Sequence, residues 1–599
     1  MGKSMAKRII AIAAVAALAL SAAGALGACG GAGTGAPATT QAAATSAAAP
    51  AEPTAQGAGQ EAAGAESGVG GADSAGESGM NPSGVFPLVQ EQETFSIMMP
   101  PIGTANPDTC WTDEEYEKMT NVHIEWITVP WDGWQDKRSI VFASGDLPDA
   151  IAGMDTRNLT ATEELMYASQ GLILPLNELL EENSVYFAQR LDEYPMTRKL
   201  ISQDNGEIYS FPYISICFHC NYSQKMFINS QWLENVGLAM PTTTDEFHAA
   251  LKAFKEQDAN GNGDPNDEIP LMAASSGWHA DIDGFLMNAF TYYEPESRFA
   301  VEGGHLEFTP ATDGYREGLR YLNTLYAEGL ISPEAFTNTA DMNQTLNVAN
   351  YPHAAIGAYA TAYQNFNGDT DIWTQYDIMP PLKGPSGLVT TPDYSLTRDV
   401  IRGNFAITNK AKNPALIVRW LDWFYSDEGV LFRRGREGIE WRKAEPGELD
   451  FNGNQADIAV LKTPEDDPYY NNVDWSQTIP SINTKEHRES VVAGQDWRDP
   501  DISNGTEIQL FKQTIPYAEV ARSVDISLPR LTVPEGQISD YSRIETEITD
   551  YCKETLVKFI TGALSLDTDW DAYKAQLDKY QLQEYVKMSD DAYQSFLSR

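Results

Sequence analysis

The fold class follows from residues 95–152, which read FSIMMPPIGTANPDTCWTDEEYEKMTNVHIEWITVPWDGWQDKRSIVFASGDLPDAIA. Strand signals at 95–99 and 122–129 alternate with helix signals at 113–119 and 137–143. The Gly and Pro of SGDLPD, residues 144–149, mark a turn that ends the second helix and leads into a short apolar strand at 150–152. Strands that alternate with helices in this way are typical of an α/β fold.

Three further helices are predicted beyond this region. Thr243 and Glu246 form a capping box at the start of one, and Asn413 caps a second with Pro414 at its first position. A third lies near the C-terminus. Each carries apolar residues at helical spacing, which predicts one buried face; these residues are Phe247, Leu251 and Phe254, then Leu416, Ile417, Trp420, Leu421 and Phe424, then Trp570, Tyr573, Leu577 and Tyr580.

Length and charge limit the class of protein. Aromatic residues are spread over residues 85–599. This segment is longer than a single hydrophobic core usually supports, so two large lobes are expected. Removal of the first 28 residues would lower the number of Lys and Arg from 41 to 38, against 85 Asp and Glu, a formal charge of −47. Such a surface repels nucleic acid and anionic lipid head groups.

The N-terminus has the features of a lipoprotein signal. Met1–Arg8 carries three bases and no acid, and the apolar run Ile9–Leu20 is too short to span a bilayer. Leu26-Gly27-Ala28-Cys29 then reads as a lipobox, which predicts cleavage of residues 1–28 and lipidation of Cys29. The alternative is an ordinary secretory signal with a cysteine near its cleavage site. Either one exports the protein.

Residues 30–84 contain no aromatic residue and no Lys or Arg. Such a segment cannot form a core, so residues 29–84 are predicted to be a disordered tether rich in Gly, Ala and Ser. A flexible chain of this length has a reach of roughly 40 Å. The expected location is the outer face of the cell membrane, with the folded body held there by lipid.

Four cysteines follow Cys29: Cys110, Cys217, Cys220 and Cys552. Cys217 and Cys220 have the spacing of a redox motif, but such a site opens a helix after a strand, whereas residues 214–222 are expected to be extended. A zinc site would need a second Cys or His cluster, which the sequence lacks. A local pair with neither role is the remaining interpretation.

Six segments, taken in order, carry a family resemblance: Ser144–Asp149, Asp204–Tyr209, Asn229–Leu238 leading into Pro241–Phe247, Pro380–Pro385, Phe405–Tyr425, and Gly435–Gly438 followed by Trp441. In this order they resemble the extracellular solute-binding proteins of family 1, particularly the lipoproteins found beside carbohydrate ABC importers. The resemblance covers residues 85–599. It implies a type II periplasmic-binding-protein-like fold, in which two α/β lobes close on a ligand about a hinge.

The resemblance also implies a division into lobes. The first lobe is expected at 85–213 plus about 400–450, the second at 214–399 plus about 451–540, and helices at 541–599 are expected to pack on the lobes. By analogy the chain would cross between lobes near Tyr213, near Asn404 and after Trp441.

A sugar presents apolar C–H faces ringed by hydroxyl groups, so its site needs flat aromatic side chains and planar hydrogen-bonding groups. Aromatic residues outside the predicted helical faces are the candidates for ligand contact, and each has ordinary packing as its alternative. They are Trp441, Trp278, Trp131, Trp134, Tyr359, Tyr363 and Trp475, of which Trp441 is the first choice.

Residues 258–268, DANGNGDPNDE, resemble a calcium loop placed directly after a helix. Oxygen ligands at alternate positions, a glycine at the sixth and a backbone carbonyl at the seventh would surround a hard cation. The twelfth position of a standard EF-hand is Ile269 here, so the acid that ends the loop stays open. An Asx-rich turn without metal is the alternative. The candidate ligands are Asp258, Asn260, Asn262, Asp264, Asp267 and Glu268, for a structural ion.

The leading hypothesis is a monomeric, membrane-tethered receptor that captures a solute, expected to be an oligosaccharide, and delivers it to an ABC permease without breaking a bond. No catalytic residue and no organic cofactor are predicted. A secreted carbohydrate-active enzyme is the alternative, which would need two facing carboxylates that no motif singles out. A receptor for peptides or other small solutes would share the fold and differ only in the lining of its site.

Overall fold

The computed structural model describes residues 79–100, 106–154, 157–364, 371–475, 478–499, 504–522 and 527–599. These residues belong to one compact unit that begins at Ser74. The predicted signal peptide, Cys29 and the tether up to residue 78 lie outside the described residues. The prediction that the tether extends to residue 84 is wrong, because Met80 is buried in the core of the first lobe and pairs with Val89. In the part of the chain that is described, no helix has both the length and the apolar character needed to cross a bilayer.

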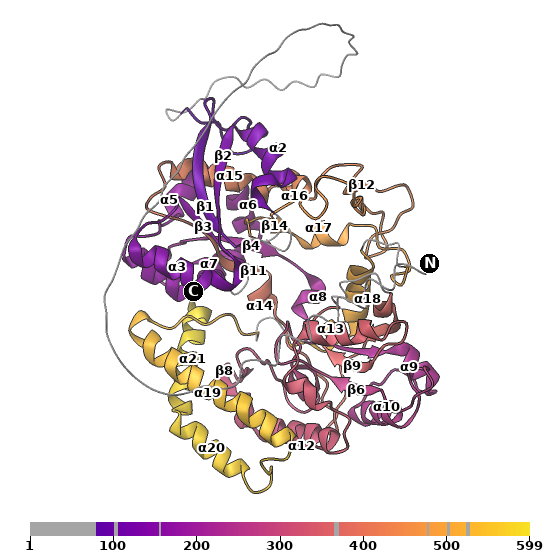
Figure 1. Ribbon diagram of the computed structural model, residues 1–599. Coiled ribbons are helices and arrows are strands. Elements are labelled where there is room, and N and C mark those ends of the chain that lie inside the picture. The colour runs from indigo at the N-terminus through magenta and orange to yellow at the C-terminus, as the bar shows by residue number, and fades with distance from the viewer. Residues whose placement is uncertain are drawn as a thin grey trace, which may run out of the picture. The chain divides into compact units, whose positions relative to one another are not determined.

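The first lobe is built on a six-stranded sheet of order β14-β4-β11-β3-β1-β2 (Figure 1). β1 is parallel to β2 and β3, whereas β11 is antiparallel to both of its neighbours. The strands are β1 (Glu93–Met99), β2 (Val122–Thr128), β3 (Ala150–Ala152), β4 (Phe211–Ser215), β11 (Val400–Ile407) and β14 (Ile482–Asn483). β11 is thus contributed by a segment far along the chain.

Helices surround this sheet and bury its two apolar faces in two hydrophobic clusters, one that includes Ile97 of β1 and one that includes Met98. They are α2 (Trp111–Thr120), α3 (Trp134–Ser144), α4 (Ala161–Ser169), α5 (Asn177–Asn183), α6 (Tyr186–Glu193), α7 (Pro195–Ile201), α15 (Pro414–Asp422), α16 (Asp427–Arg433) and α17 (Lys485–Glu489). A small sheet of β12 (Trp441–Lys443) and β13 (Ile458–Val460) lies beyond α16 in the sequence.

The second lobe is built on a four-stranded sheet of order β10-β5-β9-β6, with its own larger hydrophobic cluster. Its strands are β5 (Met226–Asn229), β6 (Ile269–Met272), β9 (Ile356–Ala360) and β10 (Tyr376–Ile378), and β7 (Phe299–Glu302) forms a hairpin with β8 (His305–Phe308). Its helices are α9 (Ser230–Asn235), α10 (Thr244–Glu256), α11 (Ile282–Leu286), α12 (Asp313–Ala327), α13 (Ala340–Ala349) and α18 (Gly505–Val520).

Three C-terminal helices join the second lobe: α19 (Ile538–Ile560), α20 (Trp570–Lys579) and α21 (Leu582–Ser598). α19 packs along α12, and α21 contacts β8 (Figure 1). Their apolar faces, including Trp570, Tyr573 and Leu577, belong to the cluster of the second lobe.

The motif at residues 144–149 ties three strands of the first lobe together. Gly145 ends α3 with a φ of 70°, a backbone conformation that favours glycine. Asp149 Oδ2 accepts hydrogen bonds from the backbone N–H and the hydroxyl of Ser96 in β1. Thr408, just after β11, donates its hydroxyl to the carbonyl of Pro148. These bonds fix the turn between α3 and β3 against β1 and the end of β11.

The lobe boundaries remain a proposal. β14 lies within the range predicted for the second lobe, but it pairs with β4 in the sheet of the first. α18 follows it and contacts β10 of the second lobe. We therefore propose that the final return to the second lobe lies after α17 and not directly after Trp441.

Replacement of Asp422 by alanine should destabilise the first lobe. The side chain of Asp422 is fully buried and accepts bonds from the Ser184 hydroxyl and from three backbone N–H groups at the start of α6, at 2.6–3.0 Å. Alanine would leave these donors buried and unpaired, so the free energy of unfolding should fall by about 3 to 5 kcal/mol. Denaturant unfolding followed by tryptophan fluorescence measures this. Asp192→Ala, an exposed change on α6, is the control and should stay within about 0.5 kcal/mol of the parent; a similar small change for Asp422→Ala would contradict the prediction.

Candidate functional site

A cavity of about 1580 Å³ is lined by residues of both lobes. Met154, after β3, and Ile401, in β11, come from the first lobe, whereas Trp278 and Tyr363 come from the second. Small-molecule sites in proteins usually have volumes of about 300 to 1,000 Å³. The cavity is therefore large enough for a ligand of several ring-sized units.

The connections between the lobes meet at one short helix, α8 (Phe218–Asn221), which follows β4. The return connection passes through α14 (Ser395–Arg398), and Tyr394 before it donates its backbone N–H to the carbonyl of Asn221. The third connection enters α18, where the ring of Phe511 lies 5.1 Å from that of Phe218. In Figure 1, α8 and α14 lie between the two sheets. A movement of one lobe against the other must therefore act on α8.

Charged groups surround α8. Glu507, at the start of α18, accepts hydrogen bonds from Arg488 of α17 at 2.6 Å and from His219 Nε2 at 3.1 Å. Burial by itself would raise the pKa of Glu507, but His219 and Arg488 bring it below its usual range. Burial lowers the pKa of His219, which favours its neutral form, so Arg488 is the group that stays positively charged beside this carboxylate. Glu507 and His219 both line the cavity.

Lys225 lies between α8 and β5 in the sequence and is fully buried. Its ammonium group donates to the carbonyls of His219 and Tyr222 at 2.7 and 2.8 Å, which satisfies the end of the short helix. Burial lowers the pKa of Lys225 to about 7. The group thus holds α8 in place without facing the cavity.

The second lobe contributes an aromatic wall. The ring centroids of Trp278 and Tyr363 are 5.7 Å apart, and the guanidinium of Arg398 lies 5.5 Å from the Trp278 ring. Tyr363 is exposed and Trp278 half-buried. Trp278 sits on a tight turn, because Gly277 and His279 both have positive φ, and a Cβ on Gly277 would lie 2.7 Å from that of Ala340. Backbone strain of this kind is concentrated at functional sites.

Trp278 and Tyr363 are the two predicted ligand residues that the structure brings to the cavity. Trp131 and Trp134 lie elsewhere in the first lobe. The guanidinium of Arg157 covers the Trp131 ring at 3.5 Å, and Trp134 is fully buried and donates its indole N–H to the carbonyl of Arg157. Both therefore have a packing role in this conformation.

The other three predicted aromatic residues are buried away from the cavity. Tyr359 is in β9, packed between other aromatic rings of the second core. Trp441, in β12, donates its indole N–H to the carbonyl of Gly435. Trp475 is enclosed in the core of the first lobe. Ligand contact by these three stays a prediction that their positions do not support.

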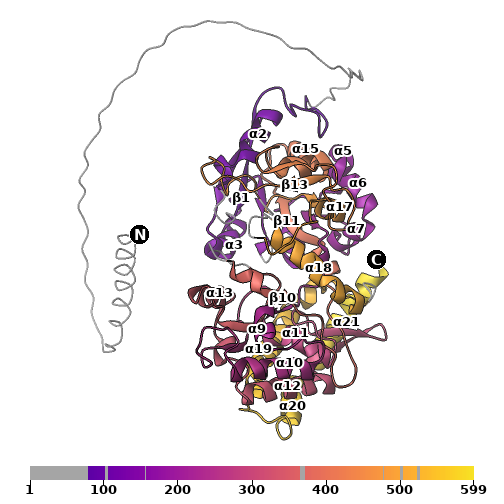
Figure 2. The ribbon, with the colours of Figure 1, turned by 90° about the vertical axis from the view of Figure 1, so that its right-hand side faces the viewer.

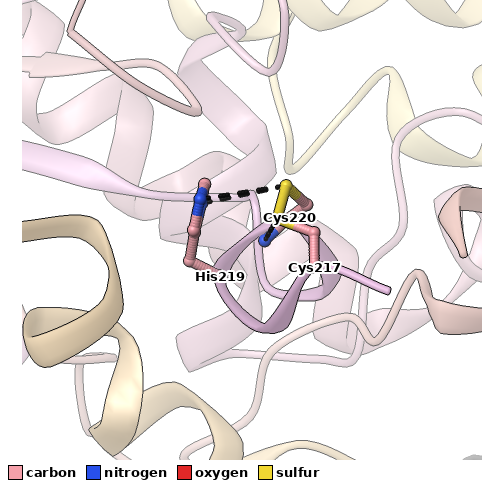
Figure 3. A group of neighbouring side chains, drawn as sticks. All are labelled: Cys217, His219 and Cys220. Atoms are coloured by element: carbon pink, nitrogen blue, oxygen red, sulfur yellow. Dashed lines mark hydrogen bonds between the residues drawn. A yellow bond between two sulfur atoms is a disulfide. The ribbon is translucent and has the colours of Figure 1, made fainter. Parts of the chain in front are cut away.

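Cys217 and Cys220 form a disulfide (Figure 3). The prediction that residues 214–222 are extended is wrong. β4 ends at Ser215, and α8 begins at Phe218 with Cys217 as its N-terminal cap. Cys217, His219 and Cys220 are close enough in space to hold a metal ion, but the disulfide removes both thiolates as ligands. Cys110 and Cys552 are free and buried.

The predicted calcium loop folds back on itself after α10. The side-chain amides of Asn260 and Asn262 donate to the two carboxylate oxygens of Asp267 at 2.9 and 2.7 Å, and Asp258 Oδ2 accepts the N–H of Gly263. Asp258 Oδ1 and Glu268 Oε2 are buried without a hydrogen-bond partner. Two buried, unpaired carboxylate oxygens in one loop have the chemistry that a calcium ion requires.

Sequence reasoning missed several residues that line the cavity, namely His219, Arg398, Glu507, Asp281, Asp283 and Arg298. The chain brings them together from five separate segments, and no spacing along the sequence indicates this. The one available signal was that α14 and α8 lie near the expected crossings between lobes.

The chain matches the family model of the bacterial extracellular solute-binding proteins over residues 89–431. It is 28% identical to the fructooligosaccharide ABC transporter substrate-binding protein FusA of Streptococcus pneumoniae, over 85% of this chain and 92% of that protein. It is 30% identical to the lipoprotein LipO of Bacillus subtilis, over 50% of this chain and 58% of that protein.

Solved structures show the same fold. FusA in complex with kestose, and an EF-hand mutant of FusA in complex with fructo-nystose, each give a TM-score of 0.66 at 26% identity, over 84% of this chain and 99% of that chain. A human-milk-oligosaccharide-binding (HMO-binding) solute-binding protein from Bifidobacterium longum infantis gives a TM-score of 0.69 at 20% identity, over 84% of this chain and 99% of that chain. The predicted two-lobe fold is thereby confirmed. The chain belongs to the bacterial extracellular solute-binding proteins.

Proposed function

We propose that this protein is a membrane-tethered receptor that captures an oligosaccharide in the cavity between its lobes and presents it to an ABC importer. The observation that carries the proposal is the lining of the cavity: an aromatic wall from the second lobe and charged groups from the connections line it together with Met154, Ser215 and Ile401 of the first lobe. FusA, which matches this chain over 85% of its length, is a fructooligosaccharide ABC transporter substrate-binding protein.

The groups of the cavity match the two faces of a sugar ring. Trp278 and Tyr363 offer flat surfaces to its apolar C–H groups. Arg398 donates hydrogen bonds, and Glu507, held as an anion by Arg488, accepts them from hydroxyl groups. A ligand that contacts both lobes at once stabilises the closed arrangement, and strain on closing falls on α8.

A binding role is favoured over hydrolysis. Glycoside hydrolysis needs one carboxylic acid and one carboxylate on opposite sides of the scissile bond. Glu507 is already engaged by a cation on one side and His219 on the other, an arrangement that suits a fixed hydrogen-bond acceptor.

A ligand panel with a parallel product assay tests the proposal. Purified mature protein is mixed with fructo-, malto-, xylo- and milk oligosaccharides and with a peptide mixture, while the melting temperature and the products are followed. We expect one saccharide class to raise the melting temperature with no product released. Released sugars would establish the enzyme instead, and stabilisation by peptides alone would establish a peptide receptor.

We further propose that Cys29 carries the lipid anchor and that calcium occupies the loop at 258–268. LipO, a relative over half of this chain, is a lipoprotein, and FusA has an EF-hand. For calcium, the buried oxygens of Asp258 and Glu268 favour Glu268 over Asp267 as the acid that ends the loop. The ion would stabilise the junction of α10 and β6 and would not touch the ligand.

Removal of calcium should lower the melting temperature. Chelation with EGTA would leave the Asp258 and Glu268 oxygens unpaired again, so the transition of the second lobe should fall by several degrees and recover on addition of Ca²⁺. Scanning calorimetry measures this. In Glu268→Gln the response to EGTA should disappear, whereas Asp264→Asn, at the position that offers a backbone carbonyl, should keep it. An unchanged melt after verified metal removal would retire the calcium site.

A further inference from the structure

The cavity continues from the aromatic wall into the second lobe, where residues of α11 and α19 and Arg298, just before β7, line it. Figure 2 shows α11 and α19 in the same, lower half of the molecule. We call this part of the cavity the inner arm and define it by its charged lining residues, Asp281, Asp283, Arg298, Glu545 and Lys553. The aromatic wall proposed for the first sugar unit lies at its entrance, because Trp278 and Asp281 are only three residues apart. The inner arm therefore extends the same ligand path.

Arg298 is the most informative residue of the inner arm. Its side chain is 92% buried, since the residue is 8% exposed. Its guanidinium makes only two long contacts, with the carbonyl of Glu296 at 3.4 Å and with the Thr549 hydroxyl at 3.5 Å. The neighbouring acids Glu296 and Glu302 pair with Arg398 and Arg522, and no ion pair of Arg298 is found among the described residues. A buried guanidinium with so few close partners indicates a missing acceptor.

The backbone at Arg298 supports this interpretation. The residue has a φ of 63°, a left-handed conformation that is uncommon for an arginine. It precedes β7 directly, so a regular strand begins one residue later. Strain of this kind persists where it aims a side chain at a functional position.

Two carboxyl groups, those of Asp281 and Asp283, line the inner arm together with Arg298. Asp281 lines the cavity with an exposed side chain. Desolvation by the surrounding protein and, as the second cause, the charge of Asp283 raise the pKa of Asp281 to about 7. Asp283 is buried and bonded to Tyr293. Asp281 and Arg298 thus line one cavity without a direct ion pair, so a ligand in the inner arm can contact both.

We propose that the inner arm is a second sugar subsite, in which adjacent hydroxyl groups of a further sugar unit bridge Arg298 and Asp281. The inference rests on the proposed function and deepens it, because it assigns the protein to oligosaccharides that reach past the aromatic wall. Each hydroxyl accepts a hydrogen bond from the guanidinium and donates one to the carboxylate. The volume of the cavity, above the usual range for small ligands, agrees with several linked units.

Affinity should therefore depend on chain length. The dissociation constant is measured by titration calorimetry for di-, tri-, tetra- and pentasaccharides of the fructo-, malto-, xylo- and milk-oligosaccharide ladders. In the ladder that binds, the added unit that enters the inner arm should strengthen binding about tenfold or more, since it adds hydrogen bonds to charged groups. Arg298→Met and Asp281→Asn should remove this gain and leave the shorter ligand within about twofold of the parent.

Matched variants separate the subsite from loss of structure. Arg543→Met, an exposed change on α19, should leave the length dependence intact, and Arg298→Lys should restore part of it. If Arg298→Met lowers the melting temperature without ligand, Asp281→Asn, with its accessible side chain, decides the result. Equal loss for all lengths, or no length dependence in the parent, overturns the subsite while the proposed function stands. Binding of no saccharide at all overturns both.

Discussion

Cys29→Ala should move the protein from the membrane fraction to the soluble fraction almost completely. Two acyl chains on one cysteine give stable anchoring, whereas the acidic body has no affinity for anionic lipid, since its formal charge after cleavage is −47. Fractionation with immunoblotting measures the change. Metabolic labelling with a palmitate analogue should show a labelled band in the parent and none in the variant.

Cys552→Ala is the matched control, because that thiol is buried in the second core and cannot take a lipid in the folded protein. It should leave both localisation and labelling unchanged. If Cys29→Ala stays on the membrane with its signal peptide removed, the lipobox interpretation fails. The roughly 40 Å reach inferred for the tether would then serve no anchoring purpose.

Trp278→Ala should weaken oligosaccharide binding by about 2 kcal/mol, roughly thirtyfold in the dissociation constant. The change removes the flat surface of the aromatic wall and leaves Tyr363 alone against the sugar ring. Titration calorimetry at constant ionic strength measures the effect. Trp278→Phe should lose less, because it keeps a ring in the same place.

Trp131→Ala provides the matched control for this prediction. Trp131 is another half-buried tryptophan, but it packs against Arg157 and does not line the cavity. Its dissociation constant should stay within about twofold of the parent. The opposite pattern, with Trp131 essential and Trp278 dispensable, would place the ligand outside the cavity.

Local structure was predictable where the signal is contained in a few neighbouring residues. The capping box of Thr243 and Glu246 and the Asn413 cap with Pro414 occur as predicted, and β3 spans the predicted residues 150–152. Both caps depend on bonds between residues three positions apart. The segment around Cys217 shows where local signals fail. Its residues lack helical spacing, yet they form a helical turn after β4 that contacts α14 and α18.

The candidate site was less predictable because tertiary contacts decide which aromatic side chains are covered. Trp441 and Trp278 both follow a glycine-containing turn in the sequence, but Trp441 donates to Gly435 within its own turn, whereas Trp278 faces the cavity. Charged residues such as Glu507 and Arg298 gave no signal, since charged residues make up 21% of this chain. Their role follows only from what lies around them in space.

A structure of the mature protein with its best-binding oligosaccharide would locate the ligand directly. We expect an intact saccharide between the lobes, with one ring against Trp278 and Tyr363 and hydrogen bonds to Arg398 and Glu507. A saccharide bound outside this cavity, or one cleaved into products within it, would rule out the proposed receptor.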